Sequence, residues 1–243
     1  MRAGRGARHA AGRRTAPRPR PAAGRPVEPV ELAALVTATD DVEEALEELA
    51  AVPGVPAAAA AELARRRPDP ERPAPWSTAV LVRLAGRPAD TDALAGVIPF
   101  LADANPRVQV EAAEVFDAAG LPAVRAALER LARRQPAAAW WEAVVTLLEA
   151  RDEPGVGRIL AGLCERLTSP AALAAALEAL PWVVEPDERA LARRVVERFR
   201  TDTRAVTDAE TDEGPLTLAL VAAEVLEALR FREGGDDGRH GHV

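Results

Sequence analysis

The sequence predicts an all-α protein, an α-solenoid built from about six helical hairpins, and three observations carry this prediction. The hydrophobic 48% of the chain is dominated by Ala, Leu and Val, with only 3% aromatic residues and no Tyr. Runs of β-branched and aromatic residues long enough to form strands are missing from the sequence. Prolines recur at intervals of about 32 residues, which is the size of a repeating helical hairpin.

Two interleaved series of prolines mark where the helices are expected to begin. The first series is Pro56, Pro88, Pro122, Pro154 and Pro186, and the second is Pro75, Pro106, Pro136, Pro170 and Pro215. Proline has a preset φ and lacks the amide hydrogen that the first turn of a helix leaves unpaired, so it is favoured at helix starts. Each repeat therefore contains two helices.

The clearest single hairpin lies between residues 103 and 131. Its first helix carries an apolar stripe at the spacing of one buried helix face: Val108, Ala112, Val115, Phe116 and Ala119. Gly120 is expected to end this helix, because glycine adopts the left-handed conformation of many helix ends. A second apolar stripe begins immediately afterwards at Leu121.

The same reasoning divides the chain into a tail, a repeat domain and a second tail. Residues 1–26 are expected to be a disordered tail rich in Arg, Ala and Pro, residues 27–232 a helical repeat domain, and residues 233–243 a disordered C-terminal tail. The predicted helix pairs are 27–38 with 41–52, 55–67 with 75–86, 88–102 with 106–119, 121–134 with 136–150, 154–168 with 170–184, and 186–200 with 214–231. The first pair has a strongly acidic outer side that suits an N-terminal cap. Residues 201–214 are expected to form an exposed acidic loop, which could receive a basic partner or the tail.

Charge is distributed unevenly between the tail and the repeat domain. Residues 1–26 contain eight arginines and no acid, so the formal net charge of −7 leaves −15 on residues 27–243. One function that follows is association of the basic tail with nucleic acid. The non-functional alternative is that residues 1–26 are a solvated extension, or that the start site is assigned too far upstream. All 31 basic residues are Arg, which fits a GC-rich, bacterial-type coding sequence, so arginine content alone is weak evidence for binding.

The sequence offers little catalytic or cofactor chemistry. Cys164 lies in an apolar stripe and is expected to be a small core residue without a disulfide or metal partner. The three histidines fall in the two tails, so no histidine base would accompany a nucleophile in the repeat domain. No cofactor and no metal are predicted. The sequence shows neither a secretory signal nor an apolar run long enough to cross a membrane, so we expect a cytoplasmic protein.

The residues Asp103, Pro106, Val108, Ala112, Val115, Phe116 and Gly120 follow a pattern that resembles the second helix of HEAT repeats. The resemblance covers roughly residues 55–230 and departs from the family at Gln109, where an Arg is usual. The polar ladder between neighbouring repeats would then be absent or built differently. The resemblance implies a right-handed superhelix whose second helices line a concave face that binds proteins or, in some branches, nucleic acid.

The tryptophans suggest where that face lies. Trp76 and Trp140 stand two repeats apart and are expected to lie in the core. Trp141, next to Trp140 on the same helix, would then point elsewhere, either onto the concave face or into the next repeat. The tract Trp140-Trp141-Glu142 is similar to one in HEAT-like DNA glycosylases, but Val145 stands where that family has a catalytic Asp.

We therefore predict a non-enzymatic protein-protein interaction scaffold or adaptor. Its concave face is expected to include Gln109, Glu114, Trp141, Glu142 and Glu178, and its acidity predicts a basic protein or peptide partner. Two alternatives stay open. One is a nucleic-acid-associated protein that uses the basic tail, and the other is a HEAT-like enzyme, of lyase or DNA glycosylase type, with an unrecognised site.

Overall fold

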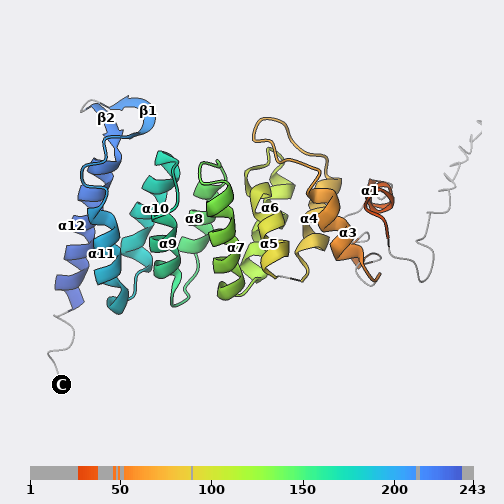
Figure 1. Ribbon diagram of the computed structural model, residues 1–243, viewed down its shortest axis with the longest axis horizontal. Coiled ribbons are helices and arrows are strands. Elements are labelled where there is room, and N and C mark those ends of the chain that lie inside the picture. Colours follow the sequence, from red (N-terminus) through yellow and green to blue (C-terminus); the bar gives the residue numbers. More distant parts are fainter. Residues whose placement is uncertain are drawn as a thin grey trace, which may run out of the picture.

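The computed structural model describes residues 27–37, 46–47, 49, 52–88, 90–211 and 214–236 of the 243. The predicted basic tail, residues 1–26, lies outside these residues, as does the acidic segment 38–45 of the predicted N-terminal cap. The described chain is mostly helical, as predicted. Its helices follow one another along the long axis of the molecule, from α1 (Pro29–Thr37) at one end to α12 (Leu218–Asp236) at the other (Figure 1).

The helices between these two ends form two rows. The first row contains α3 (Val55–Leu63), α5 (Thr91–Val97), α7 (Leu121–Arg134), α9 (Val156–Cys164) and α11 (Arg189–Glu197). The second row contains α4 (Ser77–Gly86), α6 (Pro106–Ala118), α8 (Trp141–Glu149), α10 (Pro170–Val183) and α12. Two short 3-10 segments, η1 (Ile98–Ala102) and η2 (Pro186–Glu188), adjoin α5 and α11.

Packing within and between the rows buries one continuous apolar core. In the first row α5 contacts α7, α7 contacts α9, and α9 contacts α11; in the second row α4 contacts α6, and α10 contacts both α8 and α12. Within a hairpin, α3 packs on α4, α9 on α10, and α11 on α12. The predicted stripe Val108, Ala112, Val115 and Phe116 lies in the core. α4 is buried on nearly all sides, whereas helices such as α6 and α8 turn one side to the core and the other to solvent.

Proline chemistry accounts for many of the helix starts. A proline occupies the first or second position of α3, α6, α7, α10 and η2, as the spacing predicted. Asn105 and Ser169 add side-chain caps by accepting hydrogen bonds from backbone amides of α6 and α10. The prediction for Gly120 is wrong in detail, because Gly120 is extended (φ −67°, ψ 147°) and precedes α7, while Gly54 and Gly155 take the left-handed conformation before α3 and α9.

The segment after α11 was predicted to be an exposed loop, but it contains two paired β-strands. Strands β1 (Ala205–Thr211) and β2 (Gly214–Thr217) pair antiparallel, with Ala205 opposite Thr217 and Thr211 opposite Gly214. Val206 and Leu216 pack against the core, and β1 contacts α10. The partly buried side chains of Val206 and Leu216 hold the two strands against the core. Pro215 therefore lies in β2 and not at a helix start as predicted.

The C-terminal boundary also differs from the prediction. Helix α12 continues to Asp236, beyond the predicted limit of residue 232 for the helical domain. Buried Leu229 and the contact of Arg232 with α10 hold the turns that precede this extension. Residues 237–243 of the predicted C-terminal tail lie outside the described residues.

Gly86 permits α4 and α6 to approach closely. A Cβ added at Gly86 would lie 2.3 and 2.4 Å from the two γ-carbons of Val115, which has a stiff β-branched side chain. Gly86→Ala is therefore expected to lower the free energy of unfolding by about 1–3 kcal/mol through overpacking, although Ala is the better helix former. Urea denaturation measures this loss.

Gly96 in α5 provides the matched control, because a Cβ there would meet nothing within 4 Å. Gly96→Ala is expected to be neutral or to stabilise the fold by up to about 1 kcal/mol. Adding Val115→Ala to Gly86→Ala removes the two closest carbons, so the double variant should lose less stability than the sum of the single variants. Equal stability of the Gly86→Ala and Gly96→Ala variants would contradict the close approach.

Candidate functional site

The solvent side of α8 carries two glutamates on one stripe. Glu142 and Glu149 are seven residues apart, which is about two helical turns, so they lie on the same side of α8. Both are exposed, whereas the other side of the helix buries Trp141, Val144, Val145 and Leu148. α8 contains no basic residue that could neutralise this pair.

The solvent side of α10 continues the same surface. Glu178 and Trp182 are four residues apart and both exposed, and the side chain of Trp182 is 63% accessible. The guanidinium of Arg232 from α12 lies 4.6 Å from the centroid of the Trp182 ring, and its Nη1 donates a hydrogen bond to the carbonyl of Pro181 at 2.5 Å. This contact fixes a large aromatic ring in an exposed position.

Glu178 lies among other carboxylates. Partial burial raises its pKa above the ordinary glutamate value, and the negative charges of Glu224 on α12 and Glu149 on α8 raise it further. Because the folded-state pKa is the higher one, ionisation of Glu178 costs stability, and this cost disappears as the pH falls below the pKa of the unfolded chain. We call Glu142, Glu149, Glu178 and Glu224 the acidic face.

The glutamates of the acidic face differ from Glu114 in their pairing. Within the described residues, none of its four glutamates forms a salt bridge. Glu114, which was predicted to belong to the same face, is exposed but pairs with Arg83 of α4, which also holds Glu111 at 2.9 Å. Glu114 therefore has a basic partner within the chain, although it shares Arg83 with Glu111.

Gln109 has a structural role in the turn before α6. Its Nε2 donates to the backbone carbonyl of Asp103 at 2.6 Å, and Oδ1 of buried Asp103 accepts from the amides of Ala74 and Asn105 at 3.0 and 2.9 Å. Nδ2 of Asn105 donates to the carbonyl of Ala74 at 2.7 Å. Asp103 and Asn105 therefore link this turn to the preceding hairpin through Ala74, and Gln109 holds the turn itself.

The prediction that Trp141 reaches an exposed face is wrong. Trp141 is fully buried, its ring centroid lies 4.3 Å from that of Trp140, and its Nε1 donates to the carbonyl of Gln135 at 2.8 Å. The reasoning failed because α8 begins at Trp141, so Trp140 belongs to the preceding turn and both rings can point inward. Trp76 is partly buried against the core, as predicted.

Two members of the acidic face, Glu149 and Glu224, were missed from sequence. The position of Glu149, seven residues after Glu142, was a usable signal because it repeats the same helix side. Glu224 could not be found in this way, because its place beside Glu178 depends on how α12 packs against α10.

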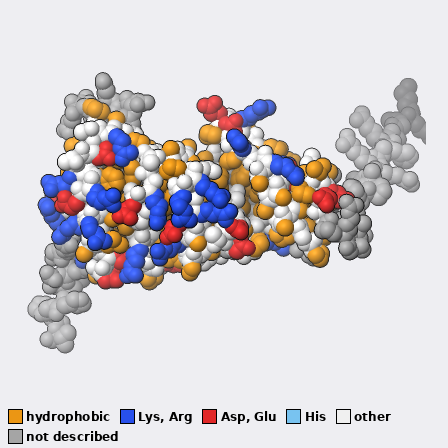
Figure 2. Space-filling view, in the orientation of Figure 1, with side chains coloured by type: hydrophobic (Ala, Val, Ile, Leu, Met, Phe, Trp, Pro, Cys, Tyr) orange, Lys and Arg blue, Asp and Glu red, His pale blue; other side chains and the backbone are white. Residues whose placement is uncertain are grey.

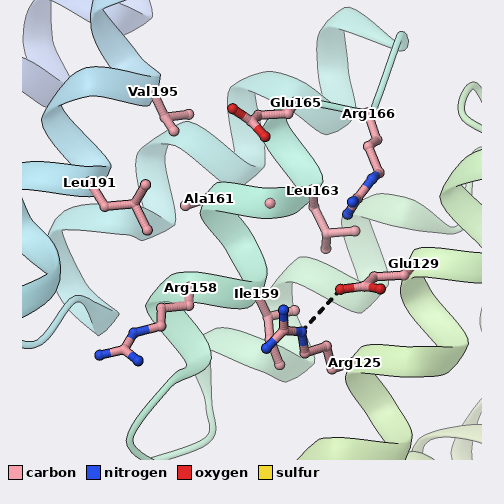
Figure 3. A pocket seen from close by; sticks show the side chains of 11 residues that line it. Arg125, Glu129, Arg158, Ile159, Ala161, Leu163, Glu165, Arg166, Leu191 and Val195 are labelled. Carbon is pink, nitrogen blue, oxygen red and sulfur yellow. Dashed lines mark hydrogen bonds and ion pairs between the residues drawn. The ribbon is translucent and has the colours of Figure 1, made fainter.

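The opposite side of the same hairpins carries a groove rimmed by arginines. The groove has a volume of about 300 Å³ and lies over α9, between α7 and α11 (Figure 3). Arg125, Arg158 and Arg166 line it together with Glu129 and Glu165, above apolar Ile159, Leu163, Leu191 and Val195. Figure 2 shows arginines gathered on this side of the molecule, over the first-row helices α7, α9 and α11.

Cys164 lies in the core, as predicted. Its side chain is buried, and burial raises the pKa of the thiol to about 12. A thiol with this pKa stays protonated near neutral pH and is a poor nucleophile.

Comparisons with protein-family models, curated proteins and solved structures find no match to this chain. In the part of the chain that the structure describes, no helix combines the length and hydropathy needed to cross a membrane.

Proposed function

We propose that this chain is a HEAT-like α-solenoid, a right-handed superhelix of about six helical hairpins, that acts as a non-enzymatic cytoplasmic adaptor. Support for the architecture comes from the alternation of successive helices between two rows and from the turn network around Asp103. The acidic face of the second-row helices binds a basic protein or peptide.

One observation carries the proposed binding site: four glutamates from three adjacent helices share a surface without a salt bridge in the described chain. Bringing like charges together costs free energy, and a basic partner would remove that cost. Trp182 is the exposed aromatic nearest to Glu178 in sequence on this side, and aromatic rings with basic or acidic neighbours are common anchors of protein interfaces.

A defined basic peptide tests the proposal. We expect the full-length protein to bind a fluorescent nona-arginine peptide and to ignore a nona-glutamate peptide in anisotropy titrations. The double variant Glu142→Arg/Glu178→Arg should weaken nona-arginine binding at least about tenfold at low salt, because it places positive charge against the peptide.

The double variant Glu71→Arg/Asp152→Arg is the matched control. It makes the same change in net charge at two exposed positions outside the acidic face and should bind like the wild type. Equal weakening by both double variants would mean that net charge alone governs binding, and unchanged binding by Glu142→Arg/Glu178→Arg would place the site elsewhere. Oligonucleotide binding that disappears when residues 1–26 are deleted would support the nucleic-acid alternative.

A further inference from the structure

The groove over α9 is lined by more arginines than glutamates. Glu129 of α7 accepts a hydrogen bond from Nε of Arg125 at 3.0 Å (Figure 3). That hydrogen bond, together with the positive charges of Arg125, Arg166 and Arg133, lowers the pKa of Glu129. The lining contains three arginines and two glutamates, so its net charge is one positive.

The shape of the groove comes from the short outward side chains of α9. Ala161 and Gly162 of α9 contribute to the lining. Arg125 of α7 lies on one side of α9, and Leu191 and Val195 of α11 lie on the other (Figure 3). The volume of about 300 Å³ is at the small end of ligand pockets, so it suits one or two protruding side chains rather than a large ligand.

The lining favours a protein surface over a polyphosphate. Several arginines on this side are already paired with acids: Arg158 holds Glu188 at 2.8 Å, and Arg198 holds Glu165 at 2.8 Å. Glu129 and Glu165 in the lining would repel a phosphate and a carboxylate alike, so the apolar floor decides between them, because a polyphosphate would leave it uncovered. Arg166 forms no salt bridge within the described residues and can pair with an incoming carboxylate.

An exposed aromatic ring beside a carboxylate, such as Trp182 beside Glu178, matches the apolar floor and the arginines of the rim. Arg232 lies over one face of the Trp182 ring, so the other face would contact the floor.

The acidic face and the groove lie back to back on the same hairpins. The acidic face is built on α8, α10 and α12, whereas the groove is built on α7, α9 and α11. α9 packs on α10 and α11 packs on α12, so the solvent sides of the two rows point away from each other. One copy can therefore present its acidic face to the groove of another copy without steric conflict between the two sites.

We propose that the basic partner of the acidic face is a second copy of this chain, whose arginine-rimmed groove over α9 receives Trp182 and Glu178. This inference rests on the proposed function of the acidic face. The whole chain is acidic, but screening at physiological salt limits charge interactions to about 8 Å, so the facing surfaces outweigh the net charge. Because the two surfaces differ, the contact is heterologous and can extend into stacks.

Sedimentation velocity of the full-length protein tests self-association over a range of protein and salt concentrations. We expect the wild type to associate with rising concentration and to dissociate as sodium chloride rises from about 50 to about 500 mM. The face variant Glu142→Arg/Glu178→Arg and the groove variant Arg125→Glu/Arg166→Glu should each weaken association at least about tenfold, because each brings like charges together. All four positions are exposed, so both variants should fold, and circular dichroism checks this.

A mixture of the two variants gives the decisive result. The reversed face of one then meets the reversed groove of the other, and the two unchanged surfaces also match, so the mixture should associate while each variant alone does not. The control Glu71→Arg/Asp152→Arg should associate like the wild type. A monomeric wild type, or a mixture that stays monomeric, overturns the inference.

The peptide titration separates the two proposals. If nona-arginine still binds the acidic face of a monomeric wild type, the proposed function stands and the second copy is the wrong partner. If the groove variant loses binding to a single-stranded oligonucleotide while the wild type never self-associates, the groove is a nucleic-acid site and the inference is wrong.

Discussion

Trp141→Ala is expected to lower the free energy of unfolding by about 3–5 kcal/mol, the usual cost of removing a large buried aromatic side chain. Trp141 is fully buried against Trp140 and the second-row core, so the substitution leaves a cavity and removes the hydrogen bond that Nε1 donates to the carbonyl of Gln135. For a chain of this length, the loss corresponds to a fall in melting temperature of about 10 °C. Thermal and urea denaturation followed by circular dichroism measure both quantities.

Trp182→Ala is the matched control, since it removes the same side chain from an exposed position. Its effect on stability should stay below about 1 kcal/mol. The two variants should also differ in binding: Trp182→Ala should weaken partner binding, whereas Trp141→Ala should not alter the surface of the molecules that remain folded. A stable Trp141→Ala protein that no longer binds its partner would restore the interpretation of Trp141 as a contact residue.

Arg151→Met is expected to cost about 2–4 kcal/mol, because one charged side chain satisfies several backbone carbonyls. Nη2 of Arg151 donates to the carbonyls of Phe116, Asp117 and Ala119 at the C-terminal end of α6. The guanidinium also lies 5.1 Å from the centroid of the Phe116 ring, and its side chain is only 7% exposed. A positive group at the negative end of a helix dipole adds to this stabilisation.

Methionine keeps the length of the side chain but cannot donate, so the measured loss isolates the hydrogen bonds and the charge. Arg151→Lys should recover part of the loss, because an ammonium retains the charge without the planar fork. Arg65→Met removes an exposed arginine in the turn after α3 that pairs with Glu62, and should cost less than about 0.5 kcal/mol. A loss for Arg151→Met no larger than that of Arg65→Met would mean that the α6 carbonyls find other donors.

The helices and the core were predictable because their signals are local. Proline spacing gave the starts of α6, α7 and α10, since the chemistry of an N-terminal turn depends on that residue alone. The burial of Val108, Phe116 and Cys164 followed from helical periodicity.

The parts that could not be predicted depend on contacts between distant residues. Strands β1 and β2 are held in place because Val206 and Leu216 pack against the core. No local sequence pattern reveals this packing. The pairing of charges also depends on distant residues, because Glu114 and Glu142 look alike in sequence, but only Glu114 of the two pairs with Arg83. Arg151, which holds the end of a helix more than 30 residues away, gave no signal in the sequence.

The position of Arg151 makes the middle of the molecule interdependent. It follows α8 in the chain yet holds the end of α6, and so it bridges over the whole of α7. When α8 and the turn after it open, α6 loses its C-terminal cap even though its own residues have not moved. Amide hydrogens of α6 and α8 should therefore exchange with solvent through one shared opening event, so that the array unfolds in blocks larger than one hairpin.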